Sequence, residues 1–344
     1  MLLSLPTAMI RYPSLYLRGG TNNNGLLSMS SPSAAVPAAL AAPLATSLGV
    51  HVWDMWGGSA FALNGFKCTM ATALFGVTLL LTRGTSLFSF SPTALRMLML
   101  SSLVGIIIGD LLWLRALQLL GAQDTILMSA LHPVIAWFAG TFILKQGSSP
   151  FTVLGLLFVC VGVVCTQWYK IKAMDLKNSD DATKSISDKR LLGYTLNFIN
   201  ILLDVFGSVL TRHYGTGHST FEICFLRFGF ASIGIATIAL ASKSVTRLCG
   251  LPSPSWAALP HQSTRTWISM GVGVILVTYL SPSLGNYALF GLPLAVWTAL
   301  GSLGPVYSIP IQWIREEERT PTSGVVGAAL ATVGCCLLGF ATPH

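Results

Sequence analysis

The sequence predicts an all-α polytopic membrane protein of about ten transmembrane helices, arranged as two inverted five-helix repeats. Three observations predict this fold: the chain is poor in charge, long apolar segments recur along it, and its two halves resemble each other. Only 9% of the 344 residues are charged, whereas soluble domains contain about 25%. So few charges cannot cover a soluble domain. The composition therefore excludes an ordinary soluble enzyme and a nucleic-acid-binding domain.

The apolar segments are continuous, and most approach the roughly 20 residues that a helix needs to cross the hydrocarbon core. Strands of a membrane barrel would instead be about ten residues long and alternate in polarity. The first segment contains Pro37 and Pro43, so its ends are the least defined. The ten expected spans are 36–61, 66–82, 97–119, 122–143, 150–169, 191–211, 220–242, 267–290, 292–314 and 322–341.

Two segments lie outside the expected spans. Residues 1–33 are basic and rich in serine, and the first acidic residue of the chain is Asp54. This composition is typical of an organellar transit peptide, and a short disordered leader or tail is the alternative. Residues 170–190 hold six Lys or Arg and four Asp. They predict a charged, solvated linker between a first unit, 34–169, and a second unit, 191–341.

The formal net charge of +8 is attributed to Lys and Arg in untranslocated loops or beside anionic lipid head groups. If both termini are cytosolic, that side holds six of these residues and the opposite side eleven. The positive-inside rule prefers the reverse. The orientation of the termini therefore stays open, and so does the membrane: plasma membrane, plastid or another organelle. Seven cysteines without a C-x-x-C pair and six scattered histidines predict no disulfide framework, no metal site and no cofactor.

The two halves match when they are laid over each other at one constant offset, the one that brings Pro133 onto Pro305. The same offset brings Gly155 onto Gly327 and Gly162 onto Gly334. Proline marks helix breaks and glycine marks close helix approach. Because five is odd, a five-helix unit repeated in tandem crosses the membrane in opposite senses. Such inverted pairs are typical of transporters, whose site lies between the halves near the midplane.

These motifs resemble the EamA-type repeat of the drug/metabolite transporter superfamily, over about residues 34–341. In that repeat a Trp- or Tyr-rich helix ends in Ala-Leu, a Pro-centred helix follows, and an acidic turn precedes a Gly-spaced last helix. The motifs here are Gly109–Leu117, Ser129–Val134, Gly155 and Gly162 in the first half, and Tyr287–Leu289, Gly304–Val306, Glu316–Arg319, Gly327 and Gly334 in the second. Trp56–Ser59 is similar to the family's opening Trp-Gly-Ser. The family's Glu after the fourth helix falls on Gln146 in the first half, whereas Glu318 keeps it in the second.

The resemblance implies a secondary transporter of small organic solutes that works by alternating access, and not an enzyme. Amino acids or related polar solutes are the leading hypothesis for its small-molecule substrate. A sugar-phosphate or nucleotide-sugar exchanger of the same superfamily is the alternative, although helices eight to ten lack the lysines usual in those branches. A membrane-embedded enzyme is the alternative of a different class, but clustered residues with catalytic spacing are lacking. The expected surroundings are the lipid bilayer, without nucleic acid, and a homodimer is left open.

Six charged residues fall within the expected spans. A charge at the bilayer centre costs at least about 2.5–3.5 kcal/mol, so such residues usually face a cavity or a partner. They are Asp54, Lys67, Asp110, Arg115, Asp204 and Arg227. We expect Asp54 and Asp204 at repeat-related positions facing a central cavity, near Lys67 and Arg227. There they would bind a polar substrate or exchange a proton, and structural salt bridges are the alternative.

The sixth helix has a polar face. Asn197, Asn200, Asp204 and Ser208 recur every three or four residues, which places them on one side of the helix. Such a stripe on an otherwise apolar helix lines water or another helix. With this stripe included, the candidates for substrate binding or proton coupling are Asp54, Lys67, Asp110, His132, Asn197, Asn200, Asp204 and Arg227.

Three further charged or ionisable positions carry separate expectations. Asp110 is expected to face inward. Arg115 lies about 140° around the same helix and is expected at the membrane edge. His132 precedes Pro133, which leaves a backbone carbonyl without its helical partner. The ring of His132 then serves a site, or it bonds a neighbouring helix.

Overall fold

The structure, a computed structural model, describes residues 32–53, 55–83, 90–128, 131–147, 149–175, 182–252, 254–304, 306–307, 310–311 and 322–340. Regular elements in these ranges are all helical, which confirms the all-α class. Six of the described helices are long and apolar enough to cross a membrane: Ala34–Trp53, Ala60–Thr82, Pro92–Gly121, Lys189–Tyr214, Thr220–Leu248 and Thr264–Gly291. Two shorter apolar helices are Pro150–Gly162 and Gly324–Gly334. The total of ten, and the inverted sense of the repeat, remain predictions.

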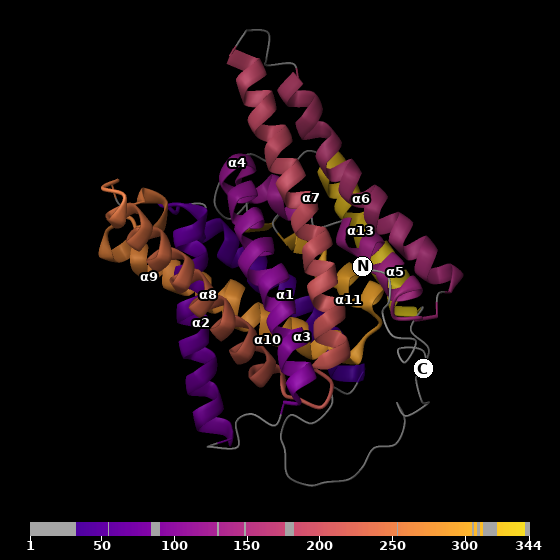
Figure 1. Ribbon diagram of the computed structural model, residues 1–344. Helices are drawn as coiled ribbons and strands as arrows, with labels where there is room; N and C mark the ends of the chain where they lie inside the picture. Colours follow the sequence, from indigo (N-terminus) through magenta and orange to yellow (C-terminus); the bar gives the residue numbers. More distant parts are fainter. Residues whose placement is uncertain are drawn as a thin grey trace.

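The helices follow one another as a bundle (Figure 1). The first half contains α1 (Pro32–Trp53), α2 (Ala60–Arg83), α3 (Pro92–Ser102), the π-helical segment η2 (Leu103–Gly109), α4 (Asp110–Met128), α5 (His132–Phe142) and α6 (Pro150–Asp175). The second half contains α7 (Ala182–Tyr214), α8 (Thr220–Leu248), the short 3-10 turn η4 (Ser255–Ala257), α9 (Thr264–Val274), the π-helical segment η5 (Ile275–Leu280), α10 (Ser281–Gly291), α11 (Leu294–Gly301) and α13 (Thr322–Phe340).

Serine caps begin three of these helices. The side chains of Ser91, Ser219 and Ser263 accept hydrogen bonds from backbone amides in the first turns of α3, α8 and α9. At Ser219 the cap is reciprocal, because Glu222 bonds the backbone amide of Ser219 in return. Such caps satisfy amide groups that have no partner inside the helix. They explain why these helices begin at Ser-x-x positions after their loops.

The internal repeat is visible in the helix boundaries. Helices α3 and α9 both have eleven residues, and the π-helical segments η2 and η5 follow them directly. The starts of α3 and α9, at Pro92 and Thr264, are related by the same offset as the sequence match. So are the starts of α6 and α13, at Pro150 and Thr322, whereas α2 and α8 are spaced somewhat more closely. The offset found in the sequence therefore also relates the secondary structure of the two halves.

The fourth helix of each half is broken. A kink at Gly121, with a φ of 81° that favours glycine, separates the third span from residues 122–128. Helix α4 then ends at Met128 and α5 begins at His132. In the second half α11 ends at Gly301, residues 302 and 303 form a turn, and helical backbone resumes at 304. The expected spans 122–143 and 292–314 are thus divided.

Each of these two breaks comes shortly before a proline that the sequence analysis had predicted to interrupt a helix, Pro133 or Pro305. Pro133 lies in the first turn of α5, where its missing amide costs nothing. Its counterpart, Pro305, lies outside the described residues.

Two expected boundaries differ in the structure. Helix α1 ends at Trp53, about eight residues before the expected end at 61, and α2 begins at Ala60, about six residues before the expected start at 66. The segment 170–190 is shorter as a linker than expected, because α6 continues to Asp175 and α7 begins at Ala182. This segment contains neither Pro nor Gly, so its lysines extend the helices. In Figure 1 these ends of α6 and α7 project beyond the rest of the bundle.

Helices α6 and α13 cross at the four glycines that the repeat had singled out. A Cβ on Gly162 would lie 2.5 Å from the backbone oxygen of Gly327. A Cβ on Gly334 would lie 2.7 Å from the backbone oxygen of Gly155. Each half therefore makes the same contact with the other, and glycine permits the backbones to touch.

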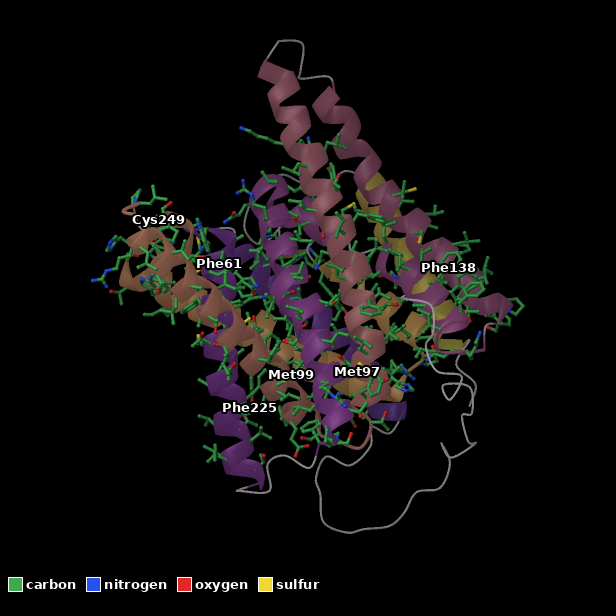
Figure 2. The ribbon with its side chains drawn as sticks, viewed as in Figure 1. Phe61, Met97, Met99, Phe138, Phe225 and Cys249 are labelled. Atoms are coloured by element: carbon green, nitrogen blue, oxygen red, sulfur yellow. The ribbon has the colours of Figure 1, made fainter. Side chains whose placement is uncertain are left out.

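Apolar side chains also cover the outside of the bundle. Phe138 is 51% exposed, and Leu157 and Ile233 are exposed as well. Figure 2 shows Phe138 at the outer surface, far from the labelled Phe225. An apolar outer surface fits lipid surroundings, since a soluble monomer rarely exposes large apolar patches. The chain is a multi-pass membrane protein.

Candidate functional site

A cavity of about 330 Å³ lies between the two halves. Its wall is built from α1, α2, η2, α4 and α5 of the first half and from α7, α8, η5, α10 and α11 of the second. Both π-helical segments and both broken fourth helices therefore meet it. Six of the eight candidate residues line the cavity: Lys67, Asp110, His132, Asn200, Asp204 and Arg227. Of the other two, Asn197 lies outside the lining and Asp54 lies outside the described residues.

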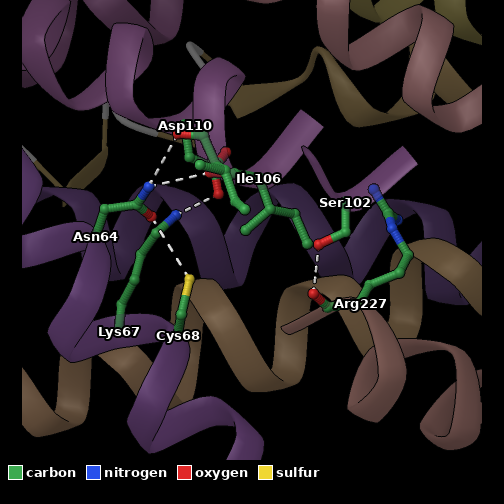
Figure 3. Close-up of polar contacts among 8 residues, drawn as sticks. Asn64, Lys67, Cys68, Ser102, Ile106, Asp110 and Arg227 are labelled. Carbon is green, nitrogen blue, oxygen red and sulfur yellow. Dashed lines mark hydrogen bonds and ion pairs between the residues drawn. The ribbon is translucent and has the colours of Figure 1, made fainter. Parts of the chain in front are cut away.

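Lys67 and Asp110 form an ion pair in the cavity wall. Lys67 is only 3% exposed, and its ammonium also lies 5.9 Å from the centre of the Trp53 ring. Asp110 is the first residue after η2. About one turn before Lys67 on α2, the Asn64 amide donates to the carbonyl oxygen of Ile106 in η2 at 3.0 Å. Figure 3 shows these contacts together: α2 bonds η2 through Asn64 and the first residue of α4 through Lys67.

His132 and Asp204 form the second pair. His132 Nε2 lies 3.2 Å from Asp204 Oδ2. The Asp204 side chain is 42% exposed and the His132 side chain 19%, so this pair is more accessible than Lys67 and Asp110. His132 is the first residue of α5, and α5 packs against α7. The expected neighbours of Asp204 were Lys67 and Arg227, but its hydrogen-bond partner in the described part of the chain is His132.

Arg227 is arranged differently from Lys67. Its Nε is buried and has no hydrogen-bond partner among the described residues. The guanidinium lies against η2, where a Cβ on Gly105 would be 3.3 Å from Nη2. The backbone oxygen of Arg227 accepts a hydrogen bond from the Ser102 hydroxyl. In Figure 3 the side chain of Arg227 extends away from Lys67 and Asp110.

The polar residues of α7 have two kinds of surroundings, the cavity and the neighbouring helix α4. Asn200, Asp204 and Ser208 line the cavity. Asn197, one turn earlier, donates to the backbone oxygen of Thr125 in α4 at 3.1 Å and is 2% exposed. The stripe was expected to face water or another helix, and its members do both.

Lys67 and Arg227 occupy matching positions, because each is the eighth residue of its helix, α2 or α8. The expected match of Asp54 with Asp204 is not described, and only the ends of the two helices can be compared. Asp204 lies ten residues before α7 ends at Tyr214, whereas α1 already ends at Trp53. Because Asp54 lies outside the described residues, its expected correspondence with Asp204 stays a prediction.

The structure adds cavity residues that the sequence reasoning missed. Thr278 in η5 lines the cavity, is 2% exposed, and its hydroxyl has no partner among the described residues. Asn286 in α10 donates to Cys224 Sγ at 3.1 Å. Asn64 lies three residues before Lys67, so the reasoning that identified the α7 stripe would also have found it. Thr278 and Asn286 lie in a segment that also contains Ser281 and Ser283, and the sequence reasoning did not consider this segment.

Gln146, where the family has glutamate, joins the two halves. Its Oε1 accepts a hydrogen bond from the Leu294 backbone amide, in the first turn of α11, at 3.0 Å. A neutral amide suffices for this bond. Its counterpart Glu318 lies outside the described residues. Within the described ranges there is also no cluster of His, Cys, Asp or Glu suited to a metal ion.

Comparison with known proteins gives three findings. No curated protein matches the chain significantly by sequence. Among solved structures 28 chains match, and one of them, titled only as the crystal structure of a protein, has a TM-score of 0.65 and 16% identity. The match covers 91% of this chain and 100% of that one, and at this identity it shows a shared fold alone. Residues 27–168 match the profile of the EamA-like transporter family. The predicted resemblance to EamA-type transporters is confirmed over these residues, which are similar to the EamA-like transporter family.

Proposed function

We propose that this protein is a secondary transporter that moves small polar metabolites, amino acids or related solutes, across its membrane by alternating access. The observation that carries the proposal is the charged cavity to which both halves contribute. Its volume, about 330 Å³, lies at the lower end of the roughly 300–1,000 Å³ usual for small-molecule sites. A solute the size of an amino acid suits this space.

Asp204 is the group proposed to bind a solute amine. Asp110 and Asp204 each have a partner in the cavity wall, and the side chain of Asp204 is the more exposed of the two. An ionised carboxylate has two oxygens and accepts about four hydrogen bonds, so Asp204 binds an ammonium group without releasing His132. Alternatively His132 and Asp204 together carry the proton that drives transport. Both roles require the carboxylate of Asp204.

Alternating access is supported by the places where the helices around the cavity are irregular. Discontinuous helices are common at the binding sites of transporters. Here the breaks near His132 and Gly301 and the segments η2 and η5 all border the cavity. A π-helical segment and a break interrupt the regular hydrogen bonding of a helix, so bending concentrates there. We therefore assign the movement between the two access states to these four places.

The test is uptake into liposomes that contain the purified protein. The standard α-amino acids are supplied one at a time, with protein-free liposomes as the control. We expect at least one to accumulate, and we expect Asp204→Asn to slow its uptake about 30-fold or more, because the amine of the bound solute loses its charged partner. Asp204→Glu, which keeps the charge, should retain part of the activity. Unchanged kinetics in Asp204→Asn would remove this residue from the mechanism.

A further inference from the structure

The two halves place a cation at the same position but provide an acid for only one of them. Lys67 and Arg227 are each the eighth residue of α2 and α8. Asp110, the partner of Lys67, directly follows η2. At the offset of the sequence repeat, the matching position after η5 is Pro282. The second half therefore lacks the carboxylate that neutralises the cation in the first half.

Arg227 is consequently the cavity cation without an ion pair in the described part of the chain. Its Nε is buried without a hydrogen-bond partner there, and a guanidinium cannot lose its charge in a protein. Leaving such a group unpaired is costly. The other acids facing the cavity already have partners, since Asp110 pairs with Lys67 and Asp204 with His132. A bound anion would supply what Arg227 lacks.

We propose that the carboxylate of the transported solute binds Arg227, in the role that Asp110 plays for Lys67. The proposal rests on the transport function proposed above and deepens it by naming the group that the second half recognises. A guanidinium presents two parallel N–H donors that match the two oxygens of a carboxylate. Gly105 contributes by leaving room, because the guanidinium lies where a larger side chain would crowd it.

The charge of the cavity favours a carboxylate over a phosphate ester. A phosphate ester is close to doubly charged at neutral pH. Lys67 is already neutralised by Asp110, which leaves one uncompensated cation, Arg227, among the charged residues described in the lining. One guanidinium balances one carboxylate. With Asp204 binding an amine, the cavity then recognises both charged groups of an α-amino acid.

The experiment restores the missing acid. Pro282→Asp should give Arg227 an internal carboxylate that competes with the solute, and Pro282→Asn is the matched control that removes the proline without adding charge. Uptake in liposomes is measured for a transported amino acid, with its amide and its deaminated acid as competitors. Folding of each variant is checked by size-exclusion chromatography and thermal melting.

In the unchanged protein we expect the amide to compete about 30-fold more weakly than the amino acid, because it lacks the charge that Arg227 binds. Arg227→Gln should abolish this preference. Pro282→Asp should raise KM for the amino acid at least about tenfold, with Pro282→Asn below about threefold. If the amide competes equally in the unchanged protein, or if Arg227→Gln keeps the preference for the amino acid, the proposal is overturned.

The same assays separate this proposal from the function on which it rests. If an amino acid is transported and Arg227→Gln still prefers it to its amide, the proposed role of Arg227 is wrong and the transport function stands. If only acids without an amine are transported, and transport depends on Arg227, the binding of the carboxylate to Arg227 is supported and the amino-acid assignment fails. Transport of phosphate esters that depends on Arg227, without transport of carboxylates, would overturn the choice of carboxylate.

Discussion

The crossing of α6 with α13 and the wall of the cavity are both built twice, once by each half, but they have kept the repeat to different degrees. At the crossing, Gly162 and Gly334 each lie against the backbone of the opposite helix in the same way. In the cavity, Lys67 has an acidic partner, whereas Arg227 has none among the described residues. The repeat is preserved in packing and broken in charge.

This difference has a physical reason. Two helices that touch through their backbones need small residues on both sides, so a change at either glycine separates them. A binding cavity has the opposite requirement, because a cavity whose charges are all paired internally offers nothing to a charged solute. One neutralised cation keeps the wall stable, and one unpaired cation attracts the ligand. The described cavity wall contains one cation of each kind, Lys67 with its acidic partner and Arg227 without one.

The largest expected effect tests the neutralised cation. Asp110→Asn should lower the stability by about 3–5 kcal/mol, because it leaves the buried ammonium of Lys67 without its partner. The double variant Lys67→Met/Asp110→Leu should recover most of the loss, since no charge is then left unpaired. Thermal melting in detergent measures both effects. Arg227→Gln should leave the melting temperature unchanged or raised, and a loss as large as that of Asp110→Asn would show that Arg227 is paired after all.

Sequence reasoning identified the charged residues described in the cavity wall because charge is so rare in this chain. Lys67, Asp110, Asp204 and Arg227 were conspicuous in apolar helices, and all four line the cavity. The pairing could not be read from the sequence, because it depends on where breaks and kinks direct the helices. The pair of His132 and Asp204, for example, joins α5 to α7 over 72 positions of the chain.

The fold was predictable to the extent that it is repeated. The constant offset between the two halves anticipated the matching starts of α3 with α9 and of α6 with α13. The π-helical segments η2 and η5 were not anticipated, since their apolar sequences look like those of an ordinary helix. A likeness of only four residues, as around Asp54 and Asp204, does not fix a position along a helix, and that match stays a prediction.

The second expected effect tests the preserved packing. Gly162→Ala and Gly334→Ala should each lower the stability by about 2–3 kcal/mol, because the added Cβ meets backbone that cannot move aside as a side chain does. Gly229→Ala is the control within a helix, since its Cβ would meet only a Thr72 methyl group at 3.5 Å. Equal losses in thermal melting are expected for the first two variants. Clearly unequal losses would show that the two glycines contribute differently to the stability of the crossing.

A smaller effect concerns the π-helical segment of the first half. Asn64→Leu should cost about 1 kcal/mol, because the carbonyl oxygen of Ile106 loses the amide that bonds it. Thr72→Val on the same helix is the control, since that hydroxyl bonds only the Cys68 carbonyl of its own helix. At the matching position of α8 stands Cys224, so η5 lacks this amide. If Asn64→Leu also changes KM, η2 contributes to binding and the two halves differ less than proposed.

The smallest effect is expected at Arg115, a cation that lies outside the described cavity lining. It tests whether a cation must lie in the cavity wall to affect transport. Arg115 is exposed, and the described contact of its guanidinium is with Gln118 Oε1, at 3.3 Å in the same helix. Arg115→Gln should change the stability by less than about 0.5 kcal/mol, as is usual at exposed sites, and leave KM unaltered. Asp110, five residues earlier, pairs across to α2 instead. Loss of transport in Arg115→Gln would mean that cations outside the cavity also guide the solute, and Arg227 would then no longer be distinguished by its place in the wall.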